Sequence, residues 1–237
     1  MATMQVITMP TVIPPTTNSP DSRAVTVLNT PAWLVVFGRF FWLPAVPVIV
    51  VCVYLSFVHS LVLMGERTNV FPSGNNAWLD VAENLDALGI PDIYEAQGLY
   101  FHQQGMLLEG AVRTEVLERS VAYWDSATRL RPDWPYYPLS ALAAEVAYNA
   151  PAKRIQERLD QLMQIAPNER GLYLNLFQYA FLEWDKLRID QQGWILQQVQ
   201  LPGGNTFSQA VQAAKHTDKL YLLCAKLPWN KIGKFCR

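Results

Sequence analysis

The longest apolar stretch of the chain runs from Leu43 to Met64 and contains no formally charged residue. At a rise of 1.5 Å per residue, a helix of this length covers about 33 Å, whereas the hydrocarbon core of a bilayer is roughly 30 Å thick. A buried core helix is the alternative interpretation. The uniform apolarity and the length favour a transmembrane helix over residues 43–64.

Beyond this stretch, apolar residues recur every three or four positions, which is the spacing of amphipathic helices. No segment alternates with period two, so the pattern predicts no sheet and an all-α fold. Asn76 is expected to cap the first helix, and Asp92 with Glu95 resembles a capping box for the second. The helices are predicted at 77–88, 93–108, 114–132, 135–148, 151–166, 168–187, 190–199, 206–214 and 217–227.

The segments on either side of the apolar stretch differ in composition. Residues 1–30 are rich in Thr, Pro and Ser, which predicts a disordered tail. Residues 31–42 gather aromatic side chains around Arg39, as is typical of a headgroup interface. Residues 65–75 are expected to form a linker, and residues 76–237 a helical domain.

Two helix ends in the middle of the chain resemble one another. The sequence WDSATRLRP is followed 35 residues later by LDQLMQIAP. This interval and the pattern of a packed helix that ends at proline are typical of tetratricopeptide-like repeats, so we expect a degenerate repeat domain. An ordinary bundle of proline-terminated helices is the alternative. The expected packing positions are Trp124, Ala127, Pro132, Leu159, Leu162 and Pro167.

The charges around the apolar stretch predict its orientation. The stretch begins too late and is too long for a cleaved signal peptide, and no small-residue cleavage site follows it. Arg23 and Arg39 precede it, Arg67 alone follows closely, and residues 68–112 contain six acids but no Lys or Arg. By the positive-inside tendency, the N-terminus is expected in the cytoplasm and the domain on the other side.

Cys224 and Cys236 are the only cysteines outside the apolar stretch. Their spacing allows a disulfide that closes a small loop and requires an oxidising compartment. Two unlinked thiols are the alternative.

Composition excludes several functions. The net charge of −1 among 237 residues argues against nucleic acid as a partner. His59, His102 and His216 share no metal-ligand spacing, and the chain lacks a nucleophile elbow, a phosphate-binding loop and a dinucleotide fingerprint. We therefore expect no catalytic residue, no metal and no cofactor. His59, within the apolar stretch, is either functional or simply interfacial.

Two surfaces remain as candidates for binding a partner or a glycan. Trp134, Tyr136 and Tyr137 could form an exposed aromatic platform, although aromatic residues at a turn between helices more often pack inward. The C-terminal region is basic, which suits an anionic glycan, lipid headgroups or an acidic protein, or merely a solvated helix face. Its candidate contacts are Lys226, Lys231 and Lys234.

Three phrases carry a resemblance to a known family: YWDSATRLRPDWPYYP, APNERGLYLNLFQYAFLEW and LCAKLPWNKIGKFCR. Over roughly residues 95–237 the chain resembles the VpsP-type polysaccharide biosynthesis proteins of Gram-negative bacteria. The resemblance implies a small inner-membrane protein with no assigned catalytic residues, acting beside glycan polymerisation and export machinery. The long Thr/Pro-rich tail departs from the short leader usual in that family.

These observations predict a non-catalytic scaffold of exopolysaccharide or capsule assembly in the bacterial inner membrane. Its periplasmic domain would bind membrane subunits of a polymerisation or export complex. One alternative is a structural subunit of a pilus, secretion or cell-division assembly. Another is a subunit of a membrane enzyme complex, in which His59 would contribute to an active site elsewhere.

Overall fold

Apolar residues at helical spacing produce helices throughout the described part of the chain. The computed structural model describes residues 44–68, 76–201 and 205–236, and these ranges contain helices and turns but no strand. The predicted all-α class is therefore confirmed. The chain divides into two units, Met1–Ile49 and Val50–Arg237. The predicted tail (1–30) and interfacial segment (31–42) lie outside the described residues.

Helix α2 (Ala45–Thr68) contains the apolar stretch and is long and apolar enough to cross a membrane. From Val50 to Phe57 most of its side chains are exposed, including Val50, Val53 and Phe57 at 53–63 %. The helix continues beyond Met64, so the first residues of the expected linker are helical. The remainder of that linker, residues 69–75, lies outside the described residues.

Helices α3 (Ala77–Asn84) and α4 (Pro91–Met106) follow. The first ends before the predicted residue 88, because Asp86 binds the backbone N–H groups of Leu88 and Ile90 and thereby forms a turn. The second starts two residues before the predicted position, so Asp92 lies inside the first turn and the expected capping box is absent. Asn76 occupies the position before α3, but its side chain binds Asp80 instead of capping the backbone.

Helix α5 (Gly110–Leu130) packs closely against α4. A Cβ atom on Gly98 would lie 2.7 Å from Nε1 of Trp124, and one on Gly105 would lie 2.6 Å from Cγ of Leu117. The Ser120 hydroxyl donates to the Gly98 carbonyl at 2.7 Å. Glycine is therefore required at two points where the α4 backbone approaches large side chains of α5.

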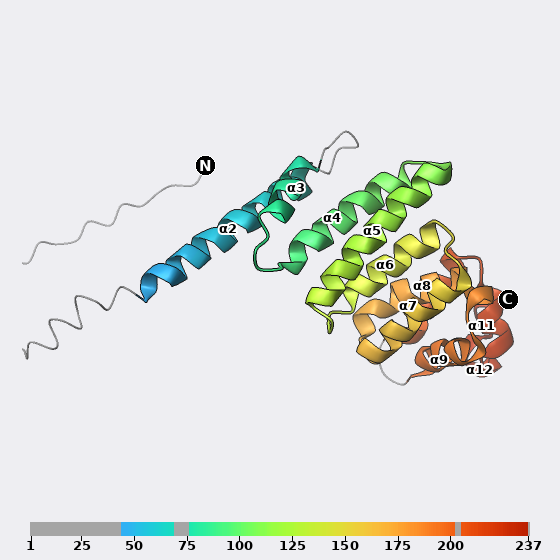
Figure 1. Cartoon of the computed structure of the whole chain (residues 1–237). Coiled ribbons are helices and arrows are strands. Elements are labelled where there is room, and N and C mark those ends of the chain that lie inside the picture. The colour runs from blue at the N-terminus through green and yellow to red at the C-terminus, as the bar shows by residue number, and fades with distance from the viewer. Residues whose placement is uncertain (1–43, 69–75, 202–204, 237) are drawn as a thin grey trace, which may run out of the picture. The chain divides into compact units, whose positions relative to one another are not determined.

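Helices α6 (Tyr136–Ala147) and α7 (Ala152–Ile165) continue the array beside α5 (Figure 1). The ends of α5 and α7 have matching geometry. The Arg131 N–H donates to the Ala127 carbonyl at 3.0 Å, and the Ala166 N–H donates to the Leu162 carbonyl at 3.0 Å. In both helices the next residue is proline, which cannot extend the helical hydrogen bonding.

The long helix predicted over 168–187 is broken into three parts. They are the 3₁₀ turn η1 (Arg170–Leu172), helix α8 (Tyr173–Leu182) and the 3₁₀ turn η2 (Trp184–Lys186). Side-chain amides satisfy the carbonyls that the break frees: Gln192 donates to Trp184 at 3.0 Å, and Gln156 donates to Lys186 at 2.6 Å. Because these amides belong to α9 and α7, tertiary contacts stabilise the break.

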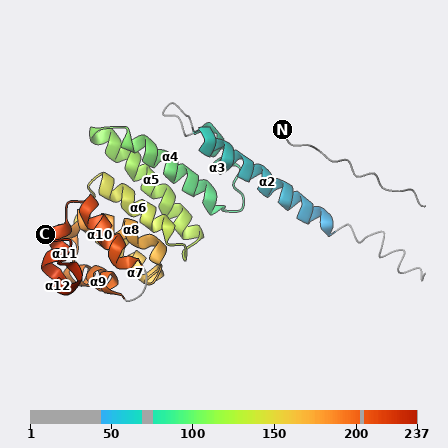
Figure 2. The same ribbon diagram turned by 180° about the vertical axis from the view of Figure 1, so that it is seen from behind.

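The remaining helices are α9 (Ile189–Gln200), α10 (Thr206–His216), α11 (Leu220–Lys226) and the short α12 (Trp229–Ile232), which the sequence pattern did not predict. Helix α10 packs against α8, and Figure 2 shows both from behind. The largest apolar core joins α6 to α12. Its central aromatic side chains are Tyr173, Phe177, Phe181 and Trp184.

Candidate functional site

The C-terminal helices present a lysine-rich surface. We define it by five lysines on or beside α10, α11 and α12, namely Lys215, Lys219, Lys226, Lys231 and Lys234. Between residues 205 and 236 the sequence contains only one acid, Asp218. Among the described residues, none of these five lysines forms an ion pair.

A disulfide holds the end of this surface in place. Cys224 on α11 is bonded to Cys236, and their Cα atoms are 6.0 Å apart. The side chains of Cys224 and Phe235 pack against the core that contains α8 and α10. The covalent link therefore fixes Phe235 and Cys236 beside α10.

Next to this link, Phe235 lines a hollow of about 320 Å³. Its ring lies 6.2 Å from that of Phe207, while the ammonium groups of Lys215 and Lys234 lie 5.3 and 4.8 Å from its centroid. Ser208, Val211 and Gln212 of α10 complete the lining. An aromatic floor with a cationic rim suits a segment that carries both apolar and acidic side chains.

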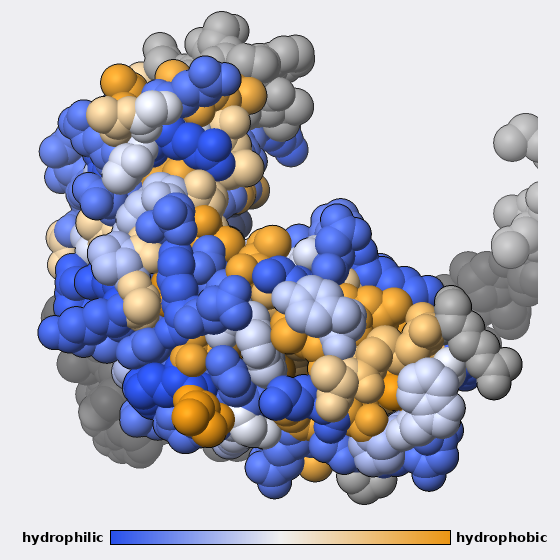
Figure 3. Space-filling model, turned by 90° about the vertical axis from the view of Figure 1, so that its right-hand side faces the viewer, coloured by the Kyte–Doolittle hydropathy of each residue, from blue (hydrophilic) through white to orange (hydrophobic). Residues whose placement is uncertain are grey.

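The predicted contacts Lys226, Lys231 and Lys234 are all exposed. Tyr221 and Trp229, at 58 and 60 % exposure, lie on the same short helices. Figure 3 views the molecule from the side on which α11 and α12 lie, and apolar side chains reach the surface there among hydrophilic ones. Exposed aromatic residues beside unpaired cations are typical of protein-binding surfaces.

The expected aromatic platform is only partly exposed. Tyr136 is 37 % exposed and its ring lies 5.1 Å from that of half-buried Trp134, over which Arg131 is placed at 4.3 Å. Tyr137 is 1 % exposed and cannot face a ligand. The expectation for Tyr137 is therefore corrected: its position in the first turn of α6 directs the ring into the protein.

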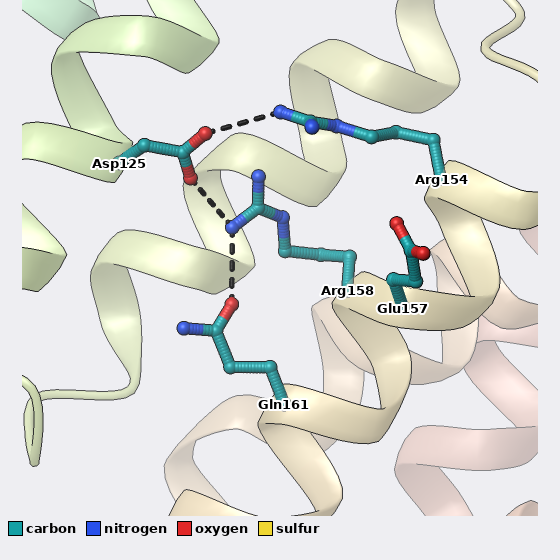
Figure 4. A pocket seen from close by; sticks show the side chains of 5 residues that line it. All are labelled: Asp125, Arg154, Glu157, Arg158 and Gln161. Atoms are coloured by element: carbon teal, nitrogen blue, oxygen red, sulfur yellow. Dashed lines mark hydrogen bonds and ion pairs between the residues drawn. The ribbon is translucent and has the colours of Figure 1, made fainter.

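The structure also contains a buried ionic cluster that the sequence reasoning missed. Glu145 of α6 is fully buried, and its carboxylate accepts from Arg158 at 2.9 Å and from Arg154 at 2.8 Å. Asp125 of α5 accepts from the same two guanidinium groups, at 2.7 Å from Arg158 and 3.1 Å from Arg154 (Figure 4). These four side chains join α5, α6 and α7.

A hollow of about 180 Å³ adjoins this ionic cluster, with Glu157 and Gln161 completing its lining. The Arg158 guanidinium also donates to Gln161 at 3.0 Å. Hydrogen bonds to Glu145 and Asp125 raise the pKa of Arg158 although its burial opposes this. Both guanidinium groups are already paired with carboxylates, so the cluster cross-links helices and offers no free charge to an anion.

Two sequence signals could have indicated the ionic cluster. Glu145 interrupts the apolar run LAAEVAY, and Arg154 and Arg158 are one helical turn apart, so they share a face of the following helix. A lone acid in a core stripe indicates a buried cation or another polar partner beside it.

The three histidines lie in separate parts of the structure. His59 is exposed on α2 and lines a hollow of about 230 Å³ together with Asp92 and apolar side chains. His102 on α4 is half-buried, 5.6 Å from the Trp124 ring, and burial together with Arg113 lowers its pKa. His216 is exposed at the end of α10. Among the described residues, no three His, Cys, Asp or Glu side chains are grouped as metal ligands.

The six expected repeat positions divide into two kinds. The side chains of Trp124, Ala127, Leu159 and Leu162 are at most 3 % exposed. Pro132 and Pro167 are exposed and directly follow the residues at which α5 and α7 end their hydrogen bonding.

Comparison with known proteins adds no relative: no family model, curated protein or solved structure matches this chain. Candidate functions therefore rest on the geometry of the residues.

Proposed function

We propose that this protein is a single-pass membrane scaffold whose helical domain binds an acidic segment of a partner protein through the lysine-rich surface. The observation that carries the proposal is the Phe235 hollow with Lys215 and Lys234 beside its ring, in a C-terminal region whose five lysines form no described ion pair. Unpaired cations steer and orient an acidic partner, whereas the aromatic floor provides the apolar contact. The role is binding, not catalysis.

The spacing of the helix ends supports this role. Helices α5, α7 and α9 end at Leu130, Ile165 and Gln200, so the interval between successive ends is 35 residues both times. This is close to the period of tetratricopeptide repeats, which stack helix pairs into binding scaffolds. In our proposal α4 with α5 and α6 with α7 are two degenerate units. A third unit departs from the pattern, because α8 packs against α10.

The proposed location is the inner membrane of a Gram-negative bacterium, with the N-terminus in the cytoplasm and the domain in the periplasm. Helix α2 has the length and apolarity to serve as the anchor. The bonded pair Cys224 and Cys236 suits an oxidising compartment. The acid-rich, Lys- and Arg-free stretch after Arg67 fits the same orientation.

The proposed pathway is exopolysaccharide or capsule assembly, which rests on the resemblance of residues 95–237 to VpsP-type proteins. The partner would then be a membrane subunit that polymerises the glycan or exports it. Scaffolding in a pilus, secretion or membrane-enzyme assembly would use the same architecture with another partner.

Binding is tested by photo-crosslinking in living cells from Tyr221 and Trp229, each replaced in turn by a photoreactive amino acid. We expect one discrete membrane-protein adduct. The triple variant Lys226→Glu, Lys231→Glu, Lys234→Glu should abolish that adduct at unchanged protein level. Lys153→Glu is the matched control, because Lys153 is an exposed lysine on α7, away from this surface. An adduct that survives the triple charge reversal would refute the proposed surface. If the only adducts contain glycan, the ligand of this surface is a polysaccharide and not a protein, which would refute the proposed protein partner.

The pathway is tested separately by measuring secreted and surface polysaccharide in a non-polar deletion strain and its complemented control. Loss or shortening of the polymer, restored by complementation, is expected. Unchanged polymer under conditions in which the glycan is made would refute the glycan-assembly role and favour the pilus or secretion alternative.

A further inference from the structure

Helix α3 returns along the second half of α2 in a defined register. Near the end of α2, Gly65 lies against the side chain of Leu79. Eleven residues earlier in α2, the Tyr54 hydroxyl donates to the Leu85 carbonyl at 2.6 Å and accepts from the Ala87 N–H at 3.0 Å. These contacts make α3 antiparallel to α2 and place the turn after α3 at the level of Tyr54.

Between the two contacts α3 rises about 9 Å, because a helix rises 1.5 Å per residue from Leu79 to Leu85, and the long Tyr54 side chain spans the rest of the distance along α2. At that level α2 is still apolar and exposed, with Val53 at 63 % and Phe57 at 53 %. Further along, protein covers one face of α2, where Val58, Leu61 and Val62 are at most 6 % exposed, while Leu63 and Met64 remain 41 and 49 % exposed. The turn after α3 therefore borders the lipid-facing side of the proposed anchor.

Helix α3 and its turn are apolar on two faces. Leu79 and Ala82 are fully buried and belong to the same core as Val58, Leu61 and Val62. On the outside, three large apolar side chains of α3 and its C-cap follow at helical spacing, and a fourth lies in the turn, with exposures of 42–59 %. We name this set the α3 stripe, and it consists of Trp78, Val81, Leu85 and Leu88.

The acids of this region point away from the α3 stripe. Gln97, which is fully buried on α4, donates to Asp80 at 3.0 Å and to Glu83 at 3.2 Å, and Tyr123 of α5 donates to Glu83 at 3.1 Å. The carboxylate of Asp86 is bound by the backbone of the turn. Inserting the α3 stripe into an apolar environment therefore does not require burying these carboxylates in it.

We infer that the α3 stripe is a second membrane contact, which lies at the boundary between headgroups and acyl chains beside α2. This inference rests on the proposed membrane anchor. Lipid is the occupant because the stripe is continuous with the exposed apolar surface of α2 at the level of Tyr54. Interfacial helices insert their apolar face about 5–10 Å into this boundary, and Trp is favoured there.

The test uses the full chain in phosphatidylcholine–phosphatidylglycerol vesicles and the environment-sensitive NBD fluorophore on single cysteines. Leu85→Cys and Leu88→Cys are made in a Cys52→Ser background, and the Cys224–Cys236 disulfide is kept oxidised. Ile189→Cys provides the water reference, since Ile189 is 87 % exposed at the start of α9. Native Cys52, exposed on α2, reports the anchor itself.

We expect blue-shifted NBD emission at positions 85, 88 and 52. Fluorescence at 85 and 88 should be lost when the vesicles contain lipids with a doxyl group near the top of the acyl chain, and fluorescence at 52, which lies near the middle of the proposed span, when the doxyl group is near the end of the acyl chain. Position 189 should show neither effect. Water-like emission at 85 and 88 with a quenched probe at 52 would overturn the membrane contact and leave the anchor standing. Blue-shifted emission at 85 and 88 without doxyl quenching would assign the α3 stripe to protein contact instead. An unquenched probe at 52 would refute the anchor and this inference together.

Discussion

The guanidinium of Arg158 donates to the carboxylate of Glu145 at 2.9 Å, and both side chains are buried, at 7 and 0 % exposure. Asp125 and Arg154 complete the ionic cluster, so that each arginine contacts two carboxylates. Desolvating these charges is costly, and the cluster is tolerated because every buried charge has a partner. It fixes the relative placement of α5, α6 and α7.

Removing one partner of this pair should therefore be strongly destabilising. We expect Arg158→Met to lower the free energy of unfolding by about 3–5 kcal/mol, because Glu145 would stay buried without its main partner. Denaturant unfolding of the full chain in detergent, followed by circular dichroism, measures this. Lys153→Ala is the control, because its ion pair with Glu157 is exposed, and its effect should stay below about 0.5 kcal/mol.

The double variant Glu145→Leu, Arg158→Met distinguishes a paired charge from a packing role. Its loss of stability should be smaller than that of Arg158→Met alone, since no uncompensated carboxylate remains in the core. Equal or greater destabilisation would show that packing, not charge pairing, dominates at this position.

The close approach of α4 to α5 gives a second prediction. Gly98→Ala places a Cβ atom against the Trp124 ring and should destabilise the protein by about 1–3 kcal/mol. Gly193→Ala is the matched control, because a Cβ atom added at this position in the interior of α9 would meet nothing within 4 Å. That variant should be stabilising by about 0.5–1 kcal/mol, owing to the higher helix propensity of Ala. Equal effects of the two substitutions would contradict the proposed role of Gly98.

The half-buried His102 gives a pH dependence. Burial and the Arg113 charge lower its pKa in the folded state, so the unfolded state binds the proton more readily. Stability should fall as pH decreases through about 6.5, with a slope of at most about 1.4 kcal/mol per pH unit, and level off below the lowered pKa. His102→Phe should reduce this slope, whereas a variant of exposed His216, such as His216→Gln, should retain it. Unfolding free energies between pH 8 and 5 would check this, and an unchanged slope in His102→Phe would count against it.

The disulfide gives a fourth prediction. Replacing Cys224 and Cys236 together with Ser should lower stability by about 3 kcal/mol in the chain-entropy account, given the separation of 12 residues. The same substitution should weaken crosslinking from Trp229, because the Phe235 hollow is no longer tied to α11. Unfolding midpoints compared with and without reductant measure the first effect. Reductant should shift the wild type but leave the double variant unchanged.

The same cysteines test the orientation. In a Cys52→Ser background, a membrane-impermeant maleimide applied to intact cells should label the protein only after reduction. Labelling that requires cell lysis would place the domain on the cytoplasmic side and contradict the proposed topology.

Much of the fold follows from local pattern. Helix-forming periodicity located α5, α6 and α7 within a few residues of their observed ends, and Pro132 and Pro167 marked where α5 and α7 stop. These features depend on residues close in sequence, which is why a sequence pattern predicts them. The break at residues 183–187 was missed, because it depends on amides of Gln156 and Gln192 from other helices. The break before α4 was predicted, but α3 ends at Asn84 instead of residue 88.

The candidate site divides in the same way. Sequence alone identified the lysines of the C-terminal region and the cysteine pair, since charge and spacing are visible in one dimension. It could not show that Lys215 of α10 lies beside the Phe235 ring, nor that Glu145 meets two arginines. Those contacts depend on how helices pack across long sequence separations.

By itself, then, the sequence determined the all-α class of the described part of the chain and one helix apolar enough to cross a membrane, because length, periodicity and proline act locally. The tertiary structure alone decided that Tyr137 faces inward, that α8 ends at Leu182, and that α3 returns along α2 to leave Trp78 and Leu88 exposed beside it. A single helix with two apolar faces does not specify which face is covered. Only the packing of α3 against Val58, Leu61 and Val62 makes that choice.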